Sequence, residues 1–310
     1  MSVALEKDVR LAEEGLPNRP SSVRVWLLAV RPATLWASVV PVVVGTSVAV
    51  AEGLVRWGPA CAALVAMLLI QVGTNLFNDY ADFQRGADTA ARLGPPRMTQ
   101  QGWLTPAQVL WGTVVAFATA CALGGYLQWI AGWPVAVLGL LSIACGLAYT
   151  GGPWPLGYHG LGDIFVFICF GLAAVLGTYY VQATALSWAA LWASIPVGCL
   201  ATAILVVNNL RDHLTDAEAG KRTLAVRFGT QFARREYCFL LAVAYAIPVF
   251  VWVTGRGSGS WLLPCLTAPL AWRSLLAVGK LEGKALNPLL GQTARIEIAF
   301  GLLLAAGVMW

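Results

Sequence analysis

The stretch TNLFNDYADFQRGAD, residues 74–88, gathers carboxamide and carboxylate side chains where a long apolar run ends. If the helix of that run continues, four of these residues stand at i, i+3, i+4 and i+7 and share one helix face: Asn75, Asn78, Asp79 and Asp82. Carboxylates at a helix C-terminus meet the negative end of the helix dipole, so they need a cation nearby. The pattern, with Asp88 as a third acid, predicts a cation-binding site.

A second polar stretch, NNLRDHLTDAEAGKRTLAVRFG, begins at Asn208 and follows another apolar run. Asn208, Asp212 and Asp216 stand at i, i+4 and i+8, and the Asn-x3-Asp spacing repeats that of the first stretch. An even number of expected membrane crossings separates the two stretches, so both lie on the same side. This arrangement indicates an internal duplication whose halves face each other around a site.

Two opposed clusters of carboxylate and carboxamide oxygen suit Mg²⁺, which binds hard oxygen ligands and commonly shares them with substrate phosphates. Basic residues follow the acids in both stretches: Arg85, Arg92 and Arg97 after the first, and Lys221 and Arg222 after the second. Acids with adjacent bases favour a phosphorylated ligand bridged by the metal. The alternative, that polar residues mark the water boundary, is weakened by the matched spacing of the two copies.

A third stretch, YTGGPWPLGYHGLGD at 149–163, lies between the two acidic stretches, and its glycines and prolines predict a tight, irregular loop. Tyr149 and Asp163 are candidate substrate contacts. Asp163 also fits the start of a helix, where an acid is favoured electrostatically, and His159 fits a solvated position.

The composition is that of a membrane protein, because 58% of residues are hydrophobic and only 11% are charged, against roughly 25% charged in soluble domains. A membrane helix needs about 20 apolar residues, which gives about nine expected spans: 26–51, 58–78, 107–127, 133–150, 161–183, 187–209, 236–254, 260–279 and 292–310. The sequence therefore predicts an all-α, polytopic membrane protein. We expect a polar segment at 1–24 and a single transmembrane domain at 25–310. Prolines and Arg273 interrupt the span at 260–279, and Arg31-Pro32 interrupts the first.

The basic residues predict the orientation. All but Arg56 and Arg256 of the 20 Lys and Arg residues fall on the side that carries the acidic stretches, and such residues favour the cytoplasmic face. We expect a multi-pass protein of the bacterial cytoplasmic membrane with its polar site facing the cytoplasm. The seven cysteines stand singly and predict neither a zinc site nor disulfides. The sequence contains no nucleic-acid-binding motif.

Together the three stretches resemble the UbiA superfamily of intramembrane prenyltransferases, whose members have nine helices and two Asp-rich motifs at the ends of the second and sixth. In the first motif, Gly86 stands where the 4-hydroxybenzoate branch has its third acid. The form NDYxDxxxGxD, the YTGGPxPLxYxGLGD loop and RDxxTDxxAGKRTLAVRxG look like the 1,4-dihydroxy-2-naphthoate branch. The resemblance implies Mg²⁺-dependent transfer of a prenyl group from an allylic polyprenyl or phytyl diphosphate to this naphthoate, with loss of CO₂, in menaquinone or phylloquinone biosynthesis.

The resemblance also implies roles for individual residues. The expected catalytic residues are Asp79, Asp82, Asp212, Asp216 and Lys221, and the expected Mg²⁺ ligands are the same four acids with Asp88. The expected substrate contacts are Asn75, Asn78, Asn208, Arg85, Arg97, Arg222, Tyr149 and Asp163. Two alternatives remain: another aromatic acceptor such as 4-hydroxybenzoate, and a Mg²⁺-binding membrane transporter that uses the same acids. A CDP-alcohol phosphotransferase is excluded because its contiguous Asp-Gly-x2-Ala-Arg motif does not occur.

Overall fold

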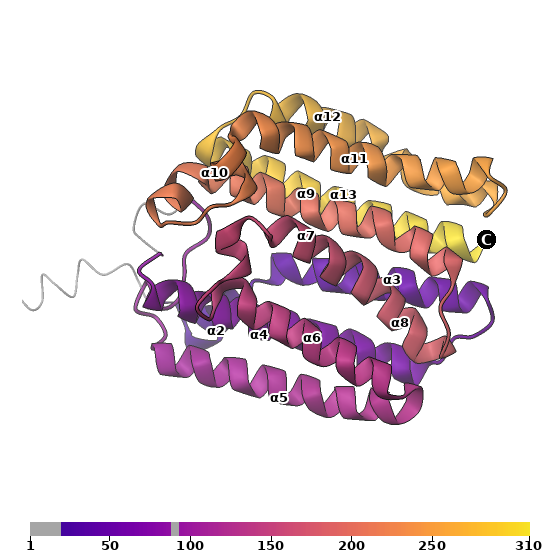
Figure 1. The fold of residues 1–310 in the computed structure, drawn as a ribbon, viewed down its shortest axis with the longest axis horizontal. Coiled ribbons are helices and arrows are strands. Elements are labelled where there is room, and N and C mark those ends of the chain that lie inside the picture. Colours follow the sequence, from indigo (N-terminus) through magenta and orange to yellow (C-terminus); the bar gives the residue numbers. More distant parts are fainter. Residues whose placement is uncertain (1–19, 88–92) are drawn as a thin grey trace, which may run out of the picture.

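The computed structural model describes residues 20–87 and 93–310, and every regular element within them is helical. Nine helices of this part are long and apolar enough to cross a membrane, which confirms the predicted all-α polytopic fold. They run side by side as a bundle (Figure 1). In chain order the elements are α2 (Ser22–Val30), α3 (Pro32–Ala51), α4 (Trp57–Gln84), α5 (Pro106–Ala131), α6 (Trp133–Thr150), η1 (Leu156–His159), α7 (Gly162–Val166), η2 (Phe167–Ala173), α8 (Ala174–Ala183), α9 (Trp188–Glu218), α10 (Leu224–Phe228), α11 (Thr230–Val253), η3 (Gly259–Thr267), α12 (Ala268–Val278), η4 (Gly283–Leu286) and α13 (Asn287–Met309).

The first expected span, 26–51, is two helices rather than one. Arg31 separates α2 from α3 and has a left-handed backbone, with φ of 56°. Pro32 follows directly, and a proline ring disfavours the helical conformation of the residue before it. The break leaves α3 as the membrane-length helix, while α2 packs Val25 and Ala29 into a cluster with Leu76 of α4.

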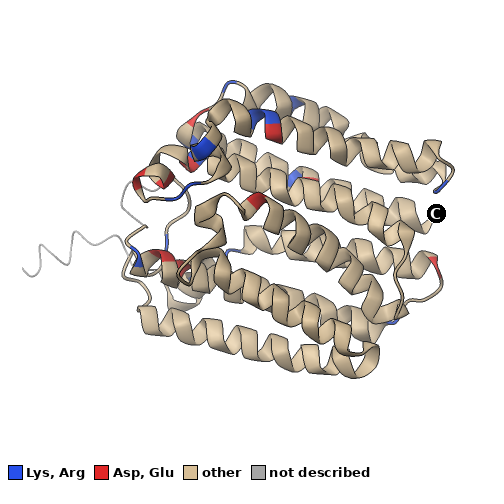
Figure 2. Ribbon diagram, in the orientation of Figure 1, with Lys and Arg blue, Asp and Glu red and all other residues tan. Residues whose placement is uncertain are grey.

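Helices α4 and α9 run past their expected ends at 78 and 209, to Gln84 and Glu218. Both acidic motifs are therefore helical, as the spacing argument assumed. The extra turns carry the acids beyond the apolar part of each helix to one end of the bundle. Figure 2 shows charged residues concentrated at that end, around α10 and the ends of α4 and α9.

The two acidic helices also end alike. In α4 the amide of Ala87 donates to the carbonyl of Asp82 at 2.9 Å, across Gly86. In α9 the amide of Lys221 donates in the same way to the carbonyl of Asp216 at 2.8 Å, across Gly220. Their φ values are 67° and 75° respectively, a left-handed conformation that glycine adopts more readily than residues with a side chain. The helix cap therefore favours glycine at position 86.

Helix α9 is the centre of the bundle, and most of its apolar stretch is buried. It packs against α3, α11, α13 and the π-helical segment η2. Gly171 of η2 meets Gly198 of α9 so closely that a Cβ on Gly171 would lie 2.6 Å from the Gly198 Cα. Such small residues allow membrane helices to approach closely, and this contact sets the position of the loop before η2 relative to the α9 motif.

The span at 260–279, which prolines and Arg273 interrupt in the sequence, is irregular. The 3₁₀ segment η3 contains Pro264 and leads into α12. The segment still packs inside the bundle, because Trp261 is 4% exposed and Gly307 of α13 lies against Ser260.

Candidate active site

The first acidic motif, the 149–163 loop and the segment after α9 meet at Asp82. Its Oδ2 accepts a hydrogen bond from Arg97 Nη2 at 3.0 Å, and its Oδ1 accepts one from the Tyr158 hydroxyl at 2.8 Å. Lys221 Nζ lies 3.4 Å from the same Oδ1. Asp82 is 1% exposed, and a carboxylate buried to this extent needs such cationic and hydrogen-bonding partners. The structure thus brings the predicted residues Asp82, Arg97 and Lys221 together.

Tyr158 links the 149–163 loop to the end of α4 and to the segment after α9. Its ring lies 4.9 Å from Lys221 Nζ and 5.2 Å from the Arg85 guanidinium carbon, both within cation–π range. Its backbone carbonyl accepts from the amide of Arg222 at 2.9 Å. Burial raises the pKa of Tyr158, and the neighbouring Asp82 carboxylate raises that pKa further, because both disfavour the phenolate. The hydroxyl therefore remains a donor to Asp82 throughout the neutral range.

Asp79 faces the segment that returns from residue 93 to α5. Its Oδ2 accepts from the amide of Met98 at 2.9 Å, and its Oδ1 accepts from both the amide and the hydroxyl of Thr99. One turn earlier, Asn75 donates to the carbonyl of Val30 at 3.0 Å and to Thr34 Oγ1 at 2.9 Å. Asp79 and Asn75 thus hold the loop and the α2–α3 break in place.

Asn78 is on the other edge of the same helix face and points to α6. Its Oδ1 accepts a hydrogen bond from Thr150 Oγ1 at 2.6 Å. Arg85 donates to the backbone carbonyls of Thr150 and Gly152. The polar face of α4 predicted from the sequence therefore has two sides. Asp79 contacts the 98–99 turn, and Asn78 contacts the start of the 150–158 loop.

The second motif is organised by Arg211, which the sequence analysis did not assign. The Arg211 side chain is 1% exposed, and its guanidinium pairs with both carboxylate oxygens of Asp212. Nε lies 2.8 Å from Oδ1, and Nη2 lies 2.6 Å from Oδ2. The guanidinium also donates to Asn208 Oδ1 at 2.7 Å and to Asn287 Oδ1 at 2.9 Å. Gly94 lies against it, since a Cβ there would be 2.8 Å from Arg211 Nη2.

Three of the remaining predicted residues belong to the part of the chain that the structure describes. Asp216 is half-buried one turn after Asp212, and Arg222 is exposed beside Tyr158. Arg222 lines a surface pocket of about 270 Å³ with Arg85 and Tyr158. Asp163 is 4% exposed, and its Oδ1 has no hydrogen-bond partner in the part of the chain that the structure describes. Asp88 lies outside the described residues.

An apolar cavity of about 180 Å³ opens beneath the polar groups, between α3, α4, α6 and the α7–η2 segment. Asn75, Asn78 and Tyr149 line its polar end, and Phe165 and Phe170 lie among its apolar walls. Gly157 and Gly162 pack on the Tyr149 ring, where a Cβ would lie 3.0 Å and 3.1 Å from its atoms. A polar, cationic mouth above an apolar cavity suits a ligand with a charged head and an apolar body.

The donor set fits Mg²⁺ only if a ligand completes the coordination shell. Within residues 20–87 and 93–310, no three His, Cys, Asp or Glu side chains group closely enough to hold a metal by themselves. Mg²⁺ typically takes one or two carboxylates and fills its remaining positions with water and substrate phosphates. The acids of α4 and α9 supply such carboxylates, and Arg97 and Lys221, which neutralise Asp82, are partners of the kind a diphosphate would attract.

Fold and site define a polytopic membrane protein with paired acidic helix ends at one face and an apolar cavity below them. The sequence profile of the UbiA prenyltransferase family matches residues 38–285, and the chain belongs to this family.

The chain is 37% identical over 290 residues to the 1,4-dihydroxy-2-naphthoate octaprenyltransferase of Mycobacterium tuberculosis, covering 93% of this chain and 98% of that relative. It is 33% identical over 300 residues to the protein of the same name from Haemophilus influenzae, covering 93% and 96%. A UbiA homologue from Archaeoglobus fulgidus, solved bound to GPP and Mg²⁺, shares the fold with a TM-score of 0.66 at 15% identity, over 92% of this chain and 99% of that one. The family assignment confirms the predicted resemblance and favours a transferase over a transporter.

Three contacts of the site were missed in the sequence. Tyr158 is a polar residue among the glycines of the 149–163 loop, on the same side as the acids, and this was the available signal. Arg211 precedes Asp212 directly, and adjacent helix residues do not normally face each other; here the long side chain folds back onto its neighbour. Thr99 carried no signal, because its role depends on how the segment after Leu93 returns to α4.

Proposed function

We propose that this protein transfers a polyprenyl group from an allylic diphosphate to 1,4-dihydroxy-2-naphthoate, with release of diphosphate and CO₂. The observation that carries the proposal is the convergence of Arg97, Lys221 and Tyr158 on Asp82, which stands one helical turn after Asn78 at the polar end of an apolar cavity. The names of the curated relatives support both substrates. Their shared name also supports a long donor, the octaprenyl diphosphate.

The diphosphate would bind at the polar mouth. Lys221 and Arg97 would donate to its oxygens, and Arg85 and Arg222 would guide it from the surface pocket that they line. Fixed cationic donors stabilise the negative charge that develops on a leaving diphosphate. The residues that would hold Mg²⁺ are Asp79, Asp82, Asp212, Asp216 and Asp88, with Asn75 and Asn208 assisting. The ion, when bound, would neutralise diphosphate oxygens as a Lewis acid, and the solved homologue with GPP and Mg²⁺ supports a divalent metal.

The reaction balances without a further reagent. The allylic C–O bond breaks and its electron pair leaves with the diphosphate, while the electron-rich ring forms the new C–C bond to the allylic carbon. The bond to the ring carboxylate then breaks, CO₂ leaves, and the electron pair returns to the ring. Tyr149 and Asn78 line the cavity next to the diphosphate mouth, where the ring would lie. Apolar walls would keep water away from the allylic cation.

We further propose that the polar mouth faces the cytoplasm of a bacterial cell. Basic residues gather at that end of the bundle (Figure 2), whereas Arg56 and Arg256 belong to the loops of the opposite end. Lys and Arg bias of this kind sets orientation in bacterial membranes.

The test is a turnover assay with the purified full-length protein in detergent. Octaprenyl diphosphate, Mg²⁺ and 1,4-dihydroxy-2-naphthoate labelled in the carboxylate should yield labelled CO₂ and a prenylated naphthoquinol in equal amounts. In a parallel arm, 4-hydroxybenzoate replaces the naphthoate. Prenylated 4-hydroxybenzoate as the preferred product would refute the proposed acceptor, and no prenylated product from either acceptor would refute prenyl transfer to aromatic acids.

A further inference from the structure

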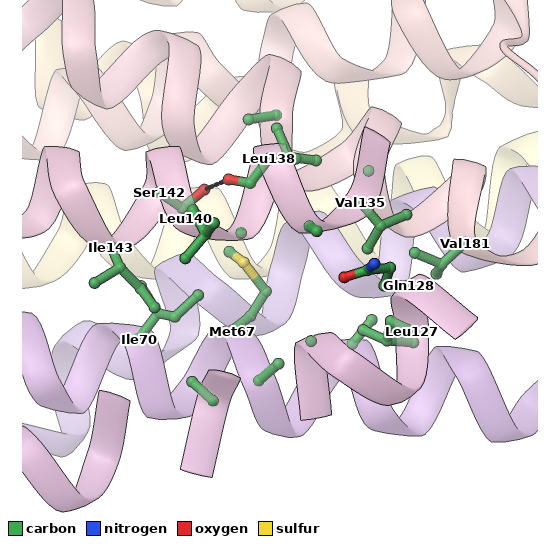
Figure 3. A pocket seen from close by; sticks show the side chains of 18 of the residues that line it. Met67, Ile70, Leu127, Gln128, Val135, Leu138, Leu140, Ser142, Ile143 and Val181 are labelled. Atoms are coloured by element: carbon green, nitrogen blue, oxygen red, sulfur yellow. Dashed lines mark hydrogen bonds between the residues drawn. The ribbon is translucent and has the colours of Figure 1, made fainter. Parts of the chain in front are cut away.

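A cavity at the end of the bundle opposite the polar mouth contains an arginine, unlike the cavities inside the bundle. The described residues that line the cavity drawn in Figure 3, between α4, α5, α6 and α8, are apolar or uncharged. The cavity at the opposite end has a volume of about 470 Å³, within the roughly 300–1,000 Å³ of small-molecule sites. Its lining residues come from the start of α9, the end of α11, the loop after α11 and η3: Trp188, Ala189, Trp192, Val251, Arg256 and Trp261.

We propose that this cavity binds the phosphate head group of an anionic phospholipid in the membrane leaflet opposite the polar mouth. Arg256 is the cation that would receive the phosphate, and the tryptophans around it would lie against the glycerol region of the lipid. The site would be independent of the polar mouth and of the reaction proposed for it.

Arg256 is held by aromatic rings rather than by an acid. Its guanidinium carbon lies 5.6 Å from the centre of the Trp192 ring and 5.7 Å from that of the Phe250 ring, both within cation–π range. The two rings pack on each other, with their centroids 5.0 Å apart. Contacts of this kind occupy the face of a guanidinium and leave the N–H groups at its edge to bind two oxygens of a phosphate.

No acid within the described residues forms an ion pair with Arg256. Charged residues are sparse at this end of the bundle (Figure 2). Glu52 belongs to the same end, but its carboxylate accepts hydrogen bonds from the hydroxyls of Tyr179 and Ser187. Basic pockets between membrane helices attract acidic lipid head groups. The arginine also favours an anionic head group over a zwitterionic one, because a zwitterionic lipid would bring its own ammonium group close to the guanidinium.

A second donor in the cavity wall has no acceptor among the described residues. The indole nitrogen Nε1 of Trp192 is buried and makes no hydrogen bond to them, and a buried N–H group without an acceptor is costly. A phosphate oxygen would supply this acceptor. Trp188 and Ala189 of the first turn of α9 also line the cavity, and the start of a helix carries a partial positive charge that favours anions.

The surroundings of the cavity suit an amphiphile better than a water-soluble anion. Trp188 in the cavity wall is 75% exposed, and tryptophan is enriched at the level of the lipid head groups. The neighbouring turns of α11 expose large apolar side chains: Val249, Phe250, Trp252 and Val253. A lipid with its phosphate at Arg256 would therefore lay its acyl chains along this part of α11.

The test uses the full-length protein in phosphatidylcholine nanodiscs that contain a small fraction of phosphatidylglycerol with a photoreactive head group. After irradiation, mass spectrometry should find the label on peptides with residues 188–192 and 256–261, and label on peptides of the basic end serves as the internal reference. Arg256→Gln should lower the ratio of the first label to the reference by about tenfold, because the charge-assisted contact to phosphate is lost. Trp192→Phe keeps a ring beside Arg256 and removes the N–H group, so it should lower the ratio by about threefold; it carries the test if the first variant does not fold.

Arg56→Gln is the matched control, because Arg56 is also exposed at this end of the bundle but lies outside the cavity. It removes the same charge and should change the ratio by less than about twofold. An unchanged ratio in both Arg256→Gln and Trp192→Phe would overturn the inference. Equal losses in Arg256→Gln and Arg56→Gln would also overturn it, because they would indicate attraction by the net charge of this end.

Two further arms test the identity of the ligand. A phosphatidylcholine probe with the same photoreactive group should label residues 188–192 and 256–261 weakly, and inorganic phosphate at the concentration of the phosphatidylglycerol probe should leave the labelling unchanged. Equal labelling by the two probes would refute the preference for an anionic head group. Displacement by inorganic phosphate would indicate a site for free phosphate and refute the lipid.

Discussion

Lys221 Nζ lies 3.4 Å from Asp82 Oδ1, and this ion pair joins the end of α4 to the segment after α9. The side chains are 17% and 2% exposed, so the pair is largely removed from water. With Arg97 on its other oxygen, Asp82 is neutralised by two cations in the free protein. A diphosphate that binds Lys221 would compete with Asp82 for it, and Asp82 would then be free to accept a metal ion. Under the proposed function, substrate and metal would replace this ion pair together.

Removal of the Lys221 charge should impair turnover strongly without unfolding the protein. We expect Lys221→Gln to lower kcat by about 10²–10³-fold, the usual effect of losing one donor that stabilises developing negative charge. Lys221→Arg should retain more activity, because the charge remains. Lys280→Gln changes an exposed lysine and is the control. A drop of less than about threefold in Lys221→Gln would show that Lys221 does not contact the leaving group.

Tyr158 should contribute through its hydroxyl and its ring separately. Tyr158→Phe removes the hydrogen bond to Asp82 and keeps the ring beside Lys221 and Arg85, so we expect kcat/KM to fall by about fivefold to tenfold. Tyr158→Leu removes both interactions and should cost about tenfold more. Equal losses in the two variants would show that the ring contacts contribute nothing.

Because the pKa of Tyr158 is raised, this residue should not contribute to the pH dependence of kcat near neutral pH. Because the phenol stays protonated in the neutral range, the pH dependence of kcat between about 6 and 9 should be the same in Tyr158→Phe as in the unaltered protein. A limb of the profile that disappears in the variant would mean that the hydroxyl titrates in this range. Full pH profiles of both proteins make the comparison.

The sequence predicted the helices and the acid-bearing ends because both depend on local patterns. Apolar length fixes a membrane span, and the Asn-x3-Asp spacing places side chains on a helix face once the helix continues, as it does to Gln84 and Glu218. The break at Arg31 was visible as Arg-Pro, although its effect, two helices, was not deduced.

The partners of the acids could not be predicted in the same way. Asp79 bonds to Met98 and Thr99 because the loop after Leu93 folds back over α4, and a path of this kind depends on contacts between segments far apart in the chain. Arg211 reaches Asp212 by a side-chain rotamer rather than by helix periodicity.

Arg211 should stabilise the fold rather than take part in chemistry. Arg211→Met leaves Asp212 as a buried, unpaired charge, so we expect the free energy of unfolding to fall by about 3–5 kcal/mol. The double variant Arg211→Met/Asp212→Leu removes both charges and should recover most of that loss. Arg234 forms an ion pair with the largely exposed Glu282, and Arg234→Met should cost about 1 kcal/mol or less. Equal losses in Arg211→Met and Arg234→Met, from reversible denaturation in detergent, would contradict the buried-pair argument.

Asp79 should have a second role besides holding the 98–99 turn. Asp79→Ala and Asp212→Ala should each abolish measurable turnover while the protein remains folded by circular dichroism. Thr99→Val removes the hydroxyl contact to Asp79 but keeps both acids, and should cost only about fivefold in kcat. If Thr99→Val were as inactive as Asp79→Ala, Asp79 would act only by positioning the turn.

Mg²⁺ should bind tightly only together with a diphosphate. The described acids do not form a group of three that could hold a metal alone, so chelation should abolish turnover and change the thermal unfolding temperature only slightly. Mg²⁺ alone and inorganic pyrophosphate alone should each shift this temperature slightly. The two together should shift it by more than the sum of the separate effects, because each completes the binding site of the other. A large shift with Mg²⁺ alone would instead indicate a metal site already formed in the free protein.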